Sequence, residues 1–309
     1  MTSDRDATPP RPSKPAWLPL CPIPTDAPQP PQAHPRHGKP SQRWRYRDAG
    51  GEVLCYVHRF DFGRGKDCRK AFAPLTYCER PGGDRAWRWQ ALAAPRPLYN
   101  LDRIYARPDA PVLVAEGEKA ADAAAILLPD HVSTTMLNGA QSPAKSDWAP
   151  LQGRAVLLWP DNDAPGRACM AKVAELLTQS GAARIEVINL HVFARTPGRA
   201  NGTATLTLGE PLPPKWDAAD ALAMGWTSEH IQLLLAAPGF STEYKKPSKP
   251  KPKPRPLNGT PRPHFAVRDD GIYHISTTKD GKPEAPYWIA SRFDITALTR
   301  DIRNENWGG

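Results

Sequence analysis

Residues 111–118 read PVLVAEGE, and residues 154–166 read RAVLLWPDNDAPG. Each stretch is a short, continuous apolar run that ends in acidic residues. Continuous apolar runs of this length are typical of strands that are buried on both faces of a parallel sheet. A chain that alternates such strands with helices forms a doubly wound α/β sheet. These two stretches therefore decide the fold class of the chain.

The neighbouring segments complete the predicted α/β unit. Two further apolar runs lie downstream of the first stretch, and the segments between the runs have the composition of helices. The predicted strands are 111–116, 132–137, 154–159 and 184–190, and the predicted helices are 119–128 and 166–180. We therefore expect an α/β catalytic domain over 108–240, built on a doubly wound parallel four-stranded sheet.

Acidic residues follow two of the predicted strands. Ligands of a doubly wound sheet bind at the carboxyl ends of its strands, which is where Glu116, Asp161 and Asp163 stand. In an extended chain Asp161 and Asp163 point to the same side, and a third carboxylate from the next strand completes an all-oxygen site suited to Mg²⁺ or Mn²⁺. Taken singly, each motif also fits a turn or a helix cap. We expect Gly117 and Gly166 to allow sharp turns from strand into helix.

Basic residues near these motifs are candidates for phosphate contacts. Lys119 and Arg167 are the best placed, because each falls in the first helical turn after an acidic loop. Lys145 and Arg154 also lie near the ends of the motifs and are further candidates. Each of the four also fits a solvated surface charge.

Prolines and positive charges are concentrated in two segments. The chain has 309 residues, 37 prolines and a net charge of +9. Residues 1–47 contribute +5 and residues 245–263 contribute +7, so the rest of the chain carries about −3. Because proline disfavours both helix and sheet, we predict a disordered leader over 1–40 and a basic linker over 241–263.

Residues 41–107 form a predicted β-containing subdomain. The β-rich runs 44–47 and 53–60 flank Asp-Ala-Gly-Gly at 48–51, which indicates a hairpin. Basic and aromatic residues interleave along this segment. Such a surface could hold a nucleic-acid backbone while stacking bases, or it could be an ordinary half-buried sheet with solvated charges.

Several classes of protein are excluded by composition. The chain has no apolar run long enough to span a membrane, and residues 1–6 lack the apolar core of a secretory signal. Residues 63–66 do not match a P-loop. The five cysteines form no CxxC pair, so we expect no zinc and a reducing cytoplasm.

The two acidic motifs together resemble the Toprim domain of bacterial and phage primases, topoisomerases and related nucleases. Five short stretches are more closely similar to the Toprim proteins of prophages and plasmids of the primase or primase-helicase type, and the resemblance covers about 44–235. These stretches are PLY (97–99), EGEKAAD (116–122), DW (147–148), WPDNDAPG (159–166) and WDAADA (216–221).

This resemblance implies roles for the acidic residues. Glu116 is implied as a general acid/base or metal ligand, and Asp161 and Asp163 as ligands of the divalent metal. Asp217 and Asp220 resemble a later acidic motif of phage primases and are further candidate metal ligands. They also fit residues that cap and flank a helix at 218–224.

Residues 264–309 resemble the opening of the helicase-like domain that follows Toprim in primase-helicases. The resemblance implies that this chain holds only the beginning of that domain, before any nucleotide-binding motif, and lacks the usual N-terminal zinc module. We therefore expect the helicase or ATPase to act in trans or on a C-terminal continuation.

The resemblance also implies a function. The expected activity is primer synthesis from NTPs on single-stranded DNA, in the cytoplasm, during replication of a phage, plasmid or other mobile element. Divalent ions would activate the 3′-hydroxyl and neutralise the triphosphate in this nucleotidyl transfer. One alternative is a metal-dependent Toprim nuclease that uses the same carboxylates. A second is a non-catalytic DNA-binding fragment, whose basic linkers would give salt-dependent affinity.

Overall fold

The structure is a computed structural model that describes residues 16–63, 67–236 and 238–245, together with five strands between 264 and 308. The chain divides into two compact units, Met1–Lys246 and Pro247–Gly309. The predicted leader and linker lie partly outside the described residues, at 1–15 and 246–263. In the second unit, three strands form an antiparallel sheet and two more form a pair. These strands are β13 (His264–Arg268), β14 (Gly271–Ile275), β15 (Tyr287–Ala290), β16 (Thr299–Arg300) and β17 (Trp307–Gly308).

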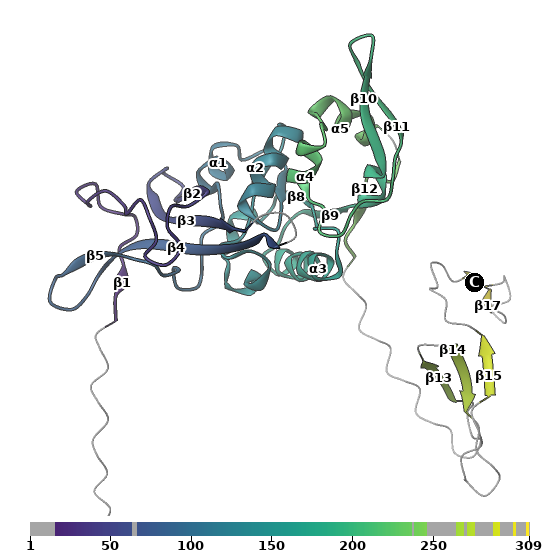
Figure 1. Cartoon of the computed structure of the whole chain (residues 1–309), viewed down its shortest axis with the longest axis horizontal. Helices are drawn as coiled ribbons and strands as arrows, with labels where there is room; N and C mark the ends of the chain where they lie inside the picture. The colour runs from purple at the N-terminus through teal and green to yellow at the C-terminus, as the bar shows by residue number, and fades with distance from the viewer. Residues whose placement is uncertain are drawn as a thin grey trace, which may run out of the picture. The chain divides into compact units, whose positions relative to one another are not determined.

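A mostly parallel sheet forms the centre of the first unit (Figure 1). The four predicted strands are present, parallel, in the spatial order β9-β8-β6-β7. They are β6 (Val112–Val114), β7 (Val132–Thr134), β8 (Ala155–Leu158) and β9 (Arg184–Ile188). A fifth strand, β12 (Ser241–Glu243), joins β9 in the antiparallel direction, so the prediction of a linker beginning at residue 241 is wrong for these three residues. The α/β class is thus confirmed, with a sheet of five strands instead of four.

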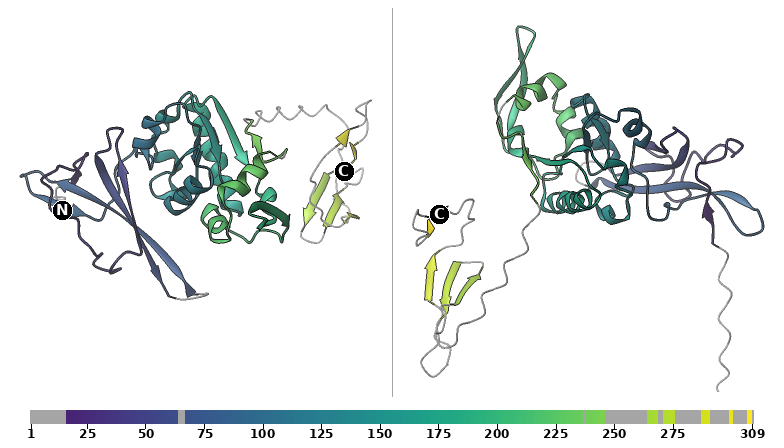
Figure 2. Two further views of the ribbon diagram at one scale, coloured as in Figure 1. Left: turned by 90° about the horizontal axis from the view of Figure 1, so that it is seen from above. Right: turned by 180° about the vertical axis from the view of Figure 1, so that it is seen from behind.

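Helices α2 (Glu118–Leu127) and α3 (Ala164–Gln179) cover opposite faces of this sheet (Figure 2). Leu113 and Leu157 pack in the apolar cluster that contains the α2 alanines, whereas Val112 and Val156 pack in the cluster that contains α3. Because successive strand residues point to opposite faces, the continuous apolar runs supply both clusters.

The N-terminal part of this unit is an antiparallel sheet in the order β1-β4-β3-β2, with β5 beside β4. Its strands are β1 (Leu18–Pro19), β2 (Gln42–Arg47), β3 (Val53–Phe62), β4 (Arg69–Glu79) and β5 (Arg85–Arg88). The turn between β2 and β3 is the predicted hairpin. There Asp48 Oδ1 accepts hydrogen bonds from the amides of Gly50 and Glu52, each at 2.9 Å.

The antiparallel sheet and the α/β part share one hydrophobic core. Trp44 and Tyr46 of β2 are buried in the same cluster as α2. Trp44 Nε1 donates to Asp122 Oδ2 at 2.8 Å, and the Tyr46 hydroxyl donates to Glu118 Oε1 at 2.8 Å. The aromatic residues of β2 are therefore core residues, as the half-buried-sheet alternative predicted. The predicted boundary at 107/108 does not separate two compact units.

The disordered-leader prediction is wrong for residues 16–40. The Arg88 guanidinium lies 3.8 Å from the centre of the Trp17 ring, and Trp87 Nε1 donates to the Pro28 carbonyl at 2.8 Å. The rings of His34 and Trp89 pack edge to face at 4.6 Å. Proline keeps this segment extended, and contacts with the sheet hold it in place.

The remaining elements of the first unit flank the two sheets. A hairpin of β10 (Arg195–Ala200) and β11 (Thr203–Leu208) projects from the body (Figure 1). It contacts helix α5 (Ser228–Leu235) through His230 Nε2, which lies 2.8 Å from the Gly198 carbonyl. The other flanking elements are α1 (Leu101–Ala106), α4 (Ala218–Ala223) and the 3₁₀ turns Gly139–Gln141, Pro143–Lys145, Ala149–Leu151 and Leu190–Phe193.

Among the described residues, no helix is both long and apolar enough to cross a membrane.

Candidate active site

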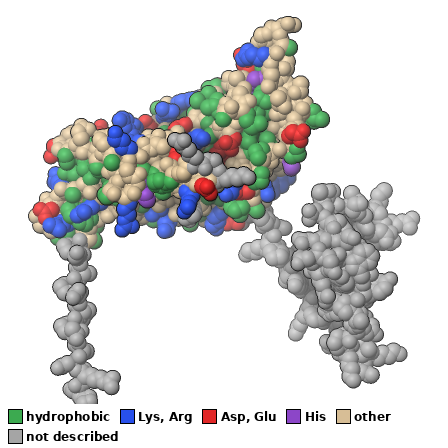
Figure 3. All heavy atoms as spheres, viewed as in Figure 1, with side chains coloured by type: hydrophobic (Ala, Val, Ile, Leu, Met, Phe, Trp, Pro, Cys, Tyr) green, Lys and Arg blue, Asp and Glu red, His purple; other side chains and the backbone are tan. Residues whose placement is uncertain are grey.

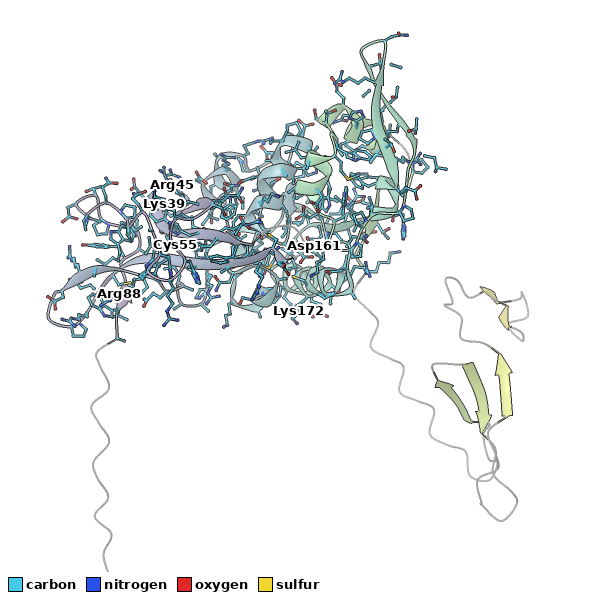
Figure 4. The ribbon with its side chains drawn as sticks, viewed as in Figure 1. Lys39, Arg45, Cys55, Arg88, Asp161 and Lys172 are labelled. Carbon is cyan, nitrogen blue, oxygen red and sulfur yellow. The ribbon has the colours of Figure 1, made fainter. Side chains whose placement is uncertain are left out.

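A cavity of about 660 Å³ lies beside the carboxyl ends of β6 and β8, between the α/β part and the antiparallel sheet. Figure 4 shows Asp161 at this junction, near the end of the long β3–β4 hairpin. One group of lining residues is acidic and a second is basic. The acidic group is Glu116, Glu118, Asp161, Asp217 and Asp220, and the basic group is Arg59, Lys70, Lys119 and Lys215.

The two predicted acidic loops contact each other directly. Glu116 Oε1 accepts a hydrogen bond from the Asp161 amide at 2.8 Å. Gly166 makes this approach possible, because a Cβ atom there would lie 2.7 Å from the Asp161 carbonyl oxygen and against the Glu116 carboxylate. Gly117 is different: its backbone is extended, and a Cβ would meet nothing within 4 Å. Glycine is therefore required at 166 for this close approach and not for the predicted sharp turn, and the structure shows no requirement for it at 117.

Two of the acidic residues cap helices. Asp163 Oδ1 accepts from the Gly166 amide at 2.7 Å, at the N-terminus of α3. Asp217 Oδ1 accepts from the amides of Ala219 and Asp220, at 2.7 and 3.0 Å, at the N-terminus of α4. The capping alternative is thus correct for Asp163 and Asp217, and Asp220 completes the cap of α4 by accepting from the Asp217 amide at 3.3 Å. Asp217 and Asp220 also line the cavity, whereas Asp163 does not.

Several acidic side chains of the site lie close enough together to raise one another's pKa. Burial raises the pKa of Asp161 to about 7, and the nearby charges of Glu116 and Asp217 act in the same direction. Burial also raises the pKa of Glu116, and Lys70 opposes both shifts. The raised pKa values indicate that the protein neutralises the acids of the cavity only in part.

On the surface seen in Figure 3, acidic and basic side chains are interspersed, without a large area of one sign.

The donor chemistry fits a hard divalent cation. The Asp161 carboxylate accepts no hydrogen bond from the described residues, and carboxylate oxygens are the ligands that Mg²⁺ and Mn²⁺ prefer. In the described part of the chain, no three His, Cys, Asp or Glu side chains already converge as a metal site. Glu116 and Asp163 each accept a hydrogen bond from a backbone amide.

The predicted basic residues occupy different places. Lys119 is exposed in the first turn of α2 and lines the cavity. Arg167 is exposed in the first turn of α3 and Lys145 is exposed after the β7 segment, and neither lines the cavity. Arg154 lies at the amino end of β8, where its guanidinium donates to the carbonyls of Ile104 at 3.1 Å and Arg107 at 2.7 Å. Arg154 therefore supports the fold at the opposite sheet edge, and its predicted phosphate contact is not supported.

Sequence reasoning missed the residue that joins the acidic loops to Asp217. Asn162 Nδ2 donates to the carbonyls of Leu212 and Pro213, each at 3.0 Å, and the Asn162 amide donates to the Trp216 carbonyl at 2.9 Å. The position of Asn162 between the two motif aspartates was the available signal. Arg59 and Lys70 were also missed, because they come from the antiparallel sheet.

No protein-family model and no curated protein matches this sequence. The structure is similar to those of three primases. The zinc-binding and RNA polymerase domains of the Aquifex aeolicus primase share 15% identity at a TM-score of 0.40, over 65% of this chain and 40% of that one. A DNA primase domain from Pseudomonas aeruginosa shares 13% identity at 0.41, over 68% and 56%. A DnaG primase catalytic domain bound to ssDNA shares 16% identity at 0.35, over 62% and 50%. The matched part is thus less than two thirds of each of these chains.

Proposed function

We propose that this chain is a Toprim-type DNA primase that transfers nucleotidyl units from NTPs to make primers on single-stranded DNA. The observation that carries the proposal is that Glu116, Asp161 and Asp217 line one cavity that is also lined by basic residues. These acids come from three separate segments of the chain. The resemblance of their motifs to Toprim primases supports the same conclusion.

The basic residues of the cavity fit an anionic substrate. Lys119 and Lys215 line the acidic side, and Arg59 and Lys70 line the wall formed by the antiparallel sheet. The acidic side chains of the cavity repel a polyanion, so positive charge near them is required for its binding. Mg²⁺ or Mn²⁺ held by Asp161 with Glu116 and Asp163 would neutralise the triphosphate and activate the attacking hydroxyl.

Glu116 is suited to moving a proton at this site. Its pKa is raised by burial, which brings the carboxylate nearer to the range in which it can both accept and donate a proton. Its hydrogen bond to the Asp161 amide fixes the position of one oxygen. We therefore propose Glu116 as the general acid/base, in agreement with the role that the resemblance implies.

The test compares Asp161→Asn with Asp130→Asn in primer synthesis from a single-stranded template, labelled NTPs and Mg²⁺ or Mn²⁺. Asp130 is an exposed aspartate that does not line the cavity, and it serves as the matched control. We expect D161N to lose roughly two orders of magnitude or more in activity and D130N to keep it. Equal activity of wild type and D161N would contradict the proposal.

The same proteins distinguish the alternatives. Metal-dependent nicking of a plasmid without NTPs, abolished in D161N, would identify a nuclease. DNA binding without either reaction, unchanged in D161N, would identify a non-catalytic fragment. A cytoplasmic location and a helicase or ATPase partner, in trans or on a continuation, belong to the proposal. Addition of such a partner is a separate arm of the synthesis assay.

A further inference from the structure

One face of the β3–β4 hairpin forms a wall of the cavity. The cross-strand pairs on this face are Val57–Pro74, Arg59–Phe72 and Asp61–Lys70. Alternate residues of a strand share a face, which explains why five of these six side chains line the cavity. The wall changes from apolar at Val57 and Pro74 to charged at Lys70.

Phe72 is the unusual residue of this wall. Its side chain is 47% exposed although it is large and apolar, and it lines a cavity whose opposite side is acidic. Its cross-strand partner Arg59 is held by Asp61, with Arg59 Nε and Asp61 Oδ1 2.9 Å apart. The ring therefore stands open to the cavity beside a fixed guanidinium.

We infer that Phe72 is a stacking platform for an unpaired nucleobase. Every base has a π-face, so stacking on a phenyl ring tolerates any sequence, and an adjacent arginine adds a cation–π or stacking contact. Lys70 and Lys119 line the same cavity and are available for the phosphates of the stacked nucleotide. The base could belong to a single strand or to a mononucleotide. This inference rests on the proposed function only in taking the ligand to be a nucleotide.

The surroundings of Phe72 fit a base better than a protein surface. An aromatic ring among Arg59, Lys70 and the acidic side chains offers little continuous apolar area. A stable protein interface buries about 800 Å² on each partner and has an apolar centre. A single base needs only one ring face, and its phosphate needs the neighbouring cations.

Photocrosslinking tests the contact directly. The full chain is irradiated with an oligodeoxynucleotide that contains 5-iodouracil, and in a second arm with 5-iodo-UTP, and the crosslinked peptide is identified by mass spectrometry. We expect the crosslink at Phe72, and the arm that gives it identifies the source of the base. Phe62→Ala is the matched control, because Phe62 is 37% exposed on the same hairpin and does not line the cavity. Crosslinks at Phe62 or elsewhere, with none at Phe72, overturn the inference.

Affinity measurements give the second readout, by fluorescence anisotropy at salt high enough to weaken binding by the basic segments. The probe is the one that crosslinks, a fluorescent single-stranded oligonucleotide or a fluorescent UTP, and we expect Phe72→Ala to weaken its binding about tenfold, within the range for loss of one stacked base. Phe72→Trp should restore binding, whereas Phe72→Leu should not. Equal affinity of wild type, F72A and F72L overturns the inference. A crosslink at Phe72 in a protein without primer synthesis refutes the proposed activity alone.

Discussion

Replacing Gly166 by alanine tests whether the two acidic loops pack as closely as the structure shows. Gly166 is the third residue of α3, where helix propensity alone favours alanine by up to about 1 kcal/mol. The structure predicts the opposite sign. A Cβ atom would lie 2.7 Å from the Asp161 carbonyl oxygen and 2.9 Å from the Asp161 Cβ, and it would press on the Glu116 carboxylate.

The magnitude follows from two effects. Overpacking of a rigid site destabilises a protein by about 1–3 kcal/mol, because side chains and backbone must shift. Separation of the loops also weakens the charged hydrogen bond between Glu116 and the Asp161 amide, and such bonds contribute about 1.5–3 kcal/mol. After allowance for the helix propensity, we expect Gly166→Ala to lower the free energy of unfolding by roughly 2–4 kcal/mol.

Urea denaturation followed by tryptophan fluorescence measures this change. Trp159 and Trp216 lie next to the acidic loops, with ring centres 6.3 Å apart, so their emission includes the site. Gly117→Ala is the matched control, because its added Cβ meets nothing within 4 Å, and we expect a change within about 1 kcal/mol. A Gly166→Ala protein that is as stable as the wild type, or more stable, would refute the close packing of the two loops.

Three further predictions concern side chains outside the acidic loops. Tyr46→Phe removes the hydroxyl that donates to buried Glu118 and should lower the free energy of unfolding by about 2–3 kcal/mol; an unchanged urea midpoint would contradict it. Burial lowers the pKa of His58 to about 4, below its ordinary 6.5, so the unfolded chain binds more protons between these values. Stability should therefore fall as the pH drops from about 6.5 towards 4, by up to about 3 kcal/mol, and a pH series should show a flatter profile for His58→Gln, which still offers Arg43 an acceptor. Arg154→Ala should lower stability by about 2–3 kcal/mol in urea titrations and leave oligonucleotide binding by anisotropy unchanged; weaker binding would restore the phosphate role.

The parallel strands could be predicted because each of them needs apolar residues on both faces. That requirement produces the continuous runs at 111–116 and 154–159, whereas a strand buried on one face alternates apolar and polar residues. The edge strand β12 carries no such pattern, since Ser241–Glu243 is short and polar and pairs on one side only. The sequence therefore predicts the fold class but does not predict the edge strand β12.

Nearness in sequence misled the interpretation of Arg154. It stands only seven residues before Asp161, yet strand β8 lies between the two, and its four residues alone span about 13 Å. The direction of the strand places one at the amino end and the other at the carboxyl end. Strand direction should therefore limit which basic residues are assigned to a site at the carboxyl edge.

The wall of the cavity formed by Arg59, Lys70 and Phe72 could not be placed from the sequence. Interleaved basic and aromatic residues indicated a surface of this kind, but Trp44 and Tyr46 in the same segment are buried core. Which aromatics are buried depends on the α/β part, more than sixty residues away, because α2 covers one face of β2 and β3. Such long-range packing leaves no local pattern.

The shared core of the antiparallel sheet and α2 limits how the two parts can move relative to each other. Two lobes that each have their own core can hinge and close over a bound molecule. Here the Trp44–Asp122 and Tyr46–Glu118 hydrogen bonds and the apolar side chains around them join the two walls of the cavity. Rotation of one wall against the other would break that core. We therefore expect the cavity to keep its shape when a ligand binds, so that binding depends on how well the ligand fits that shape and charge.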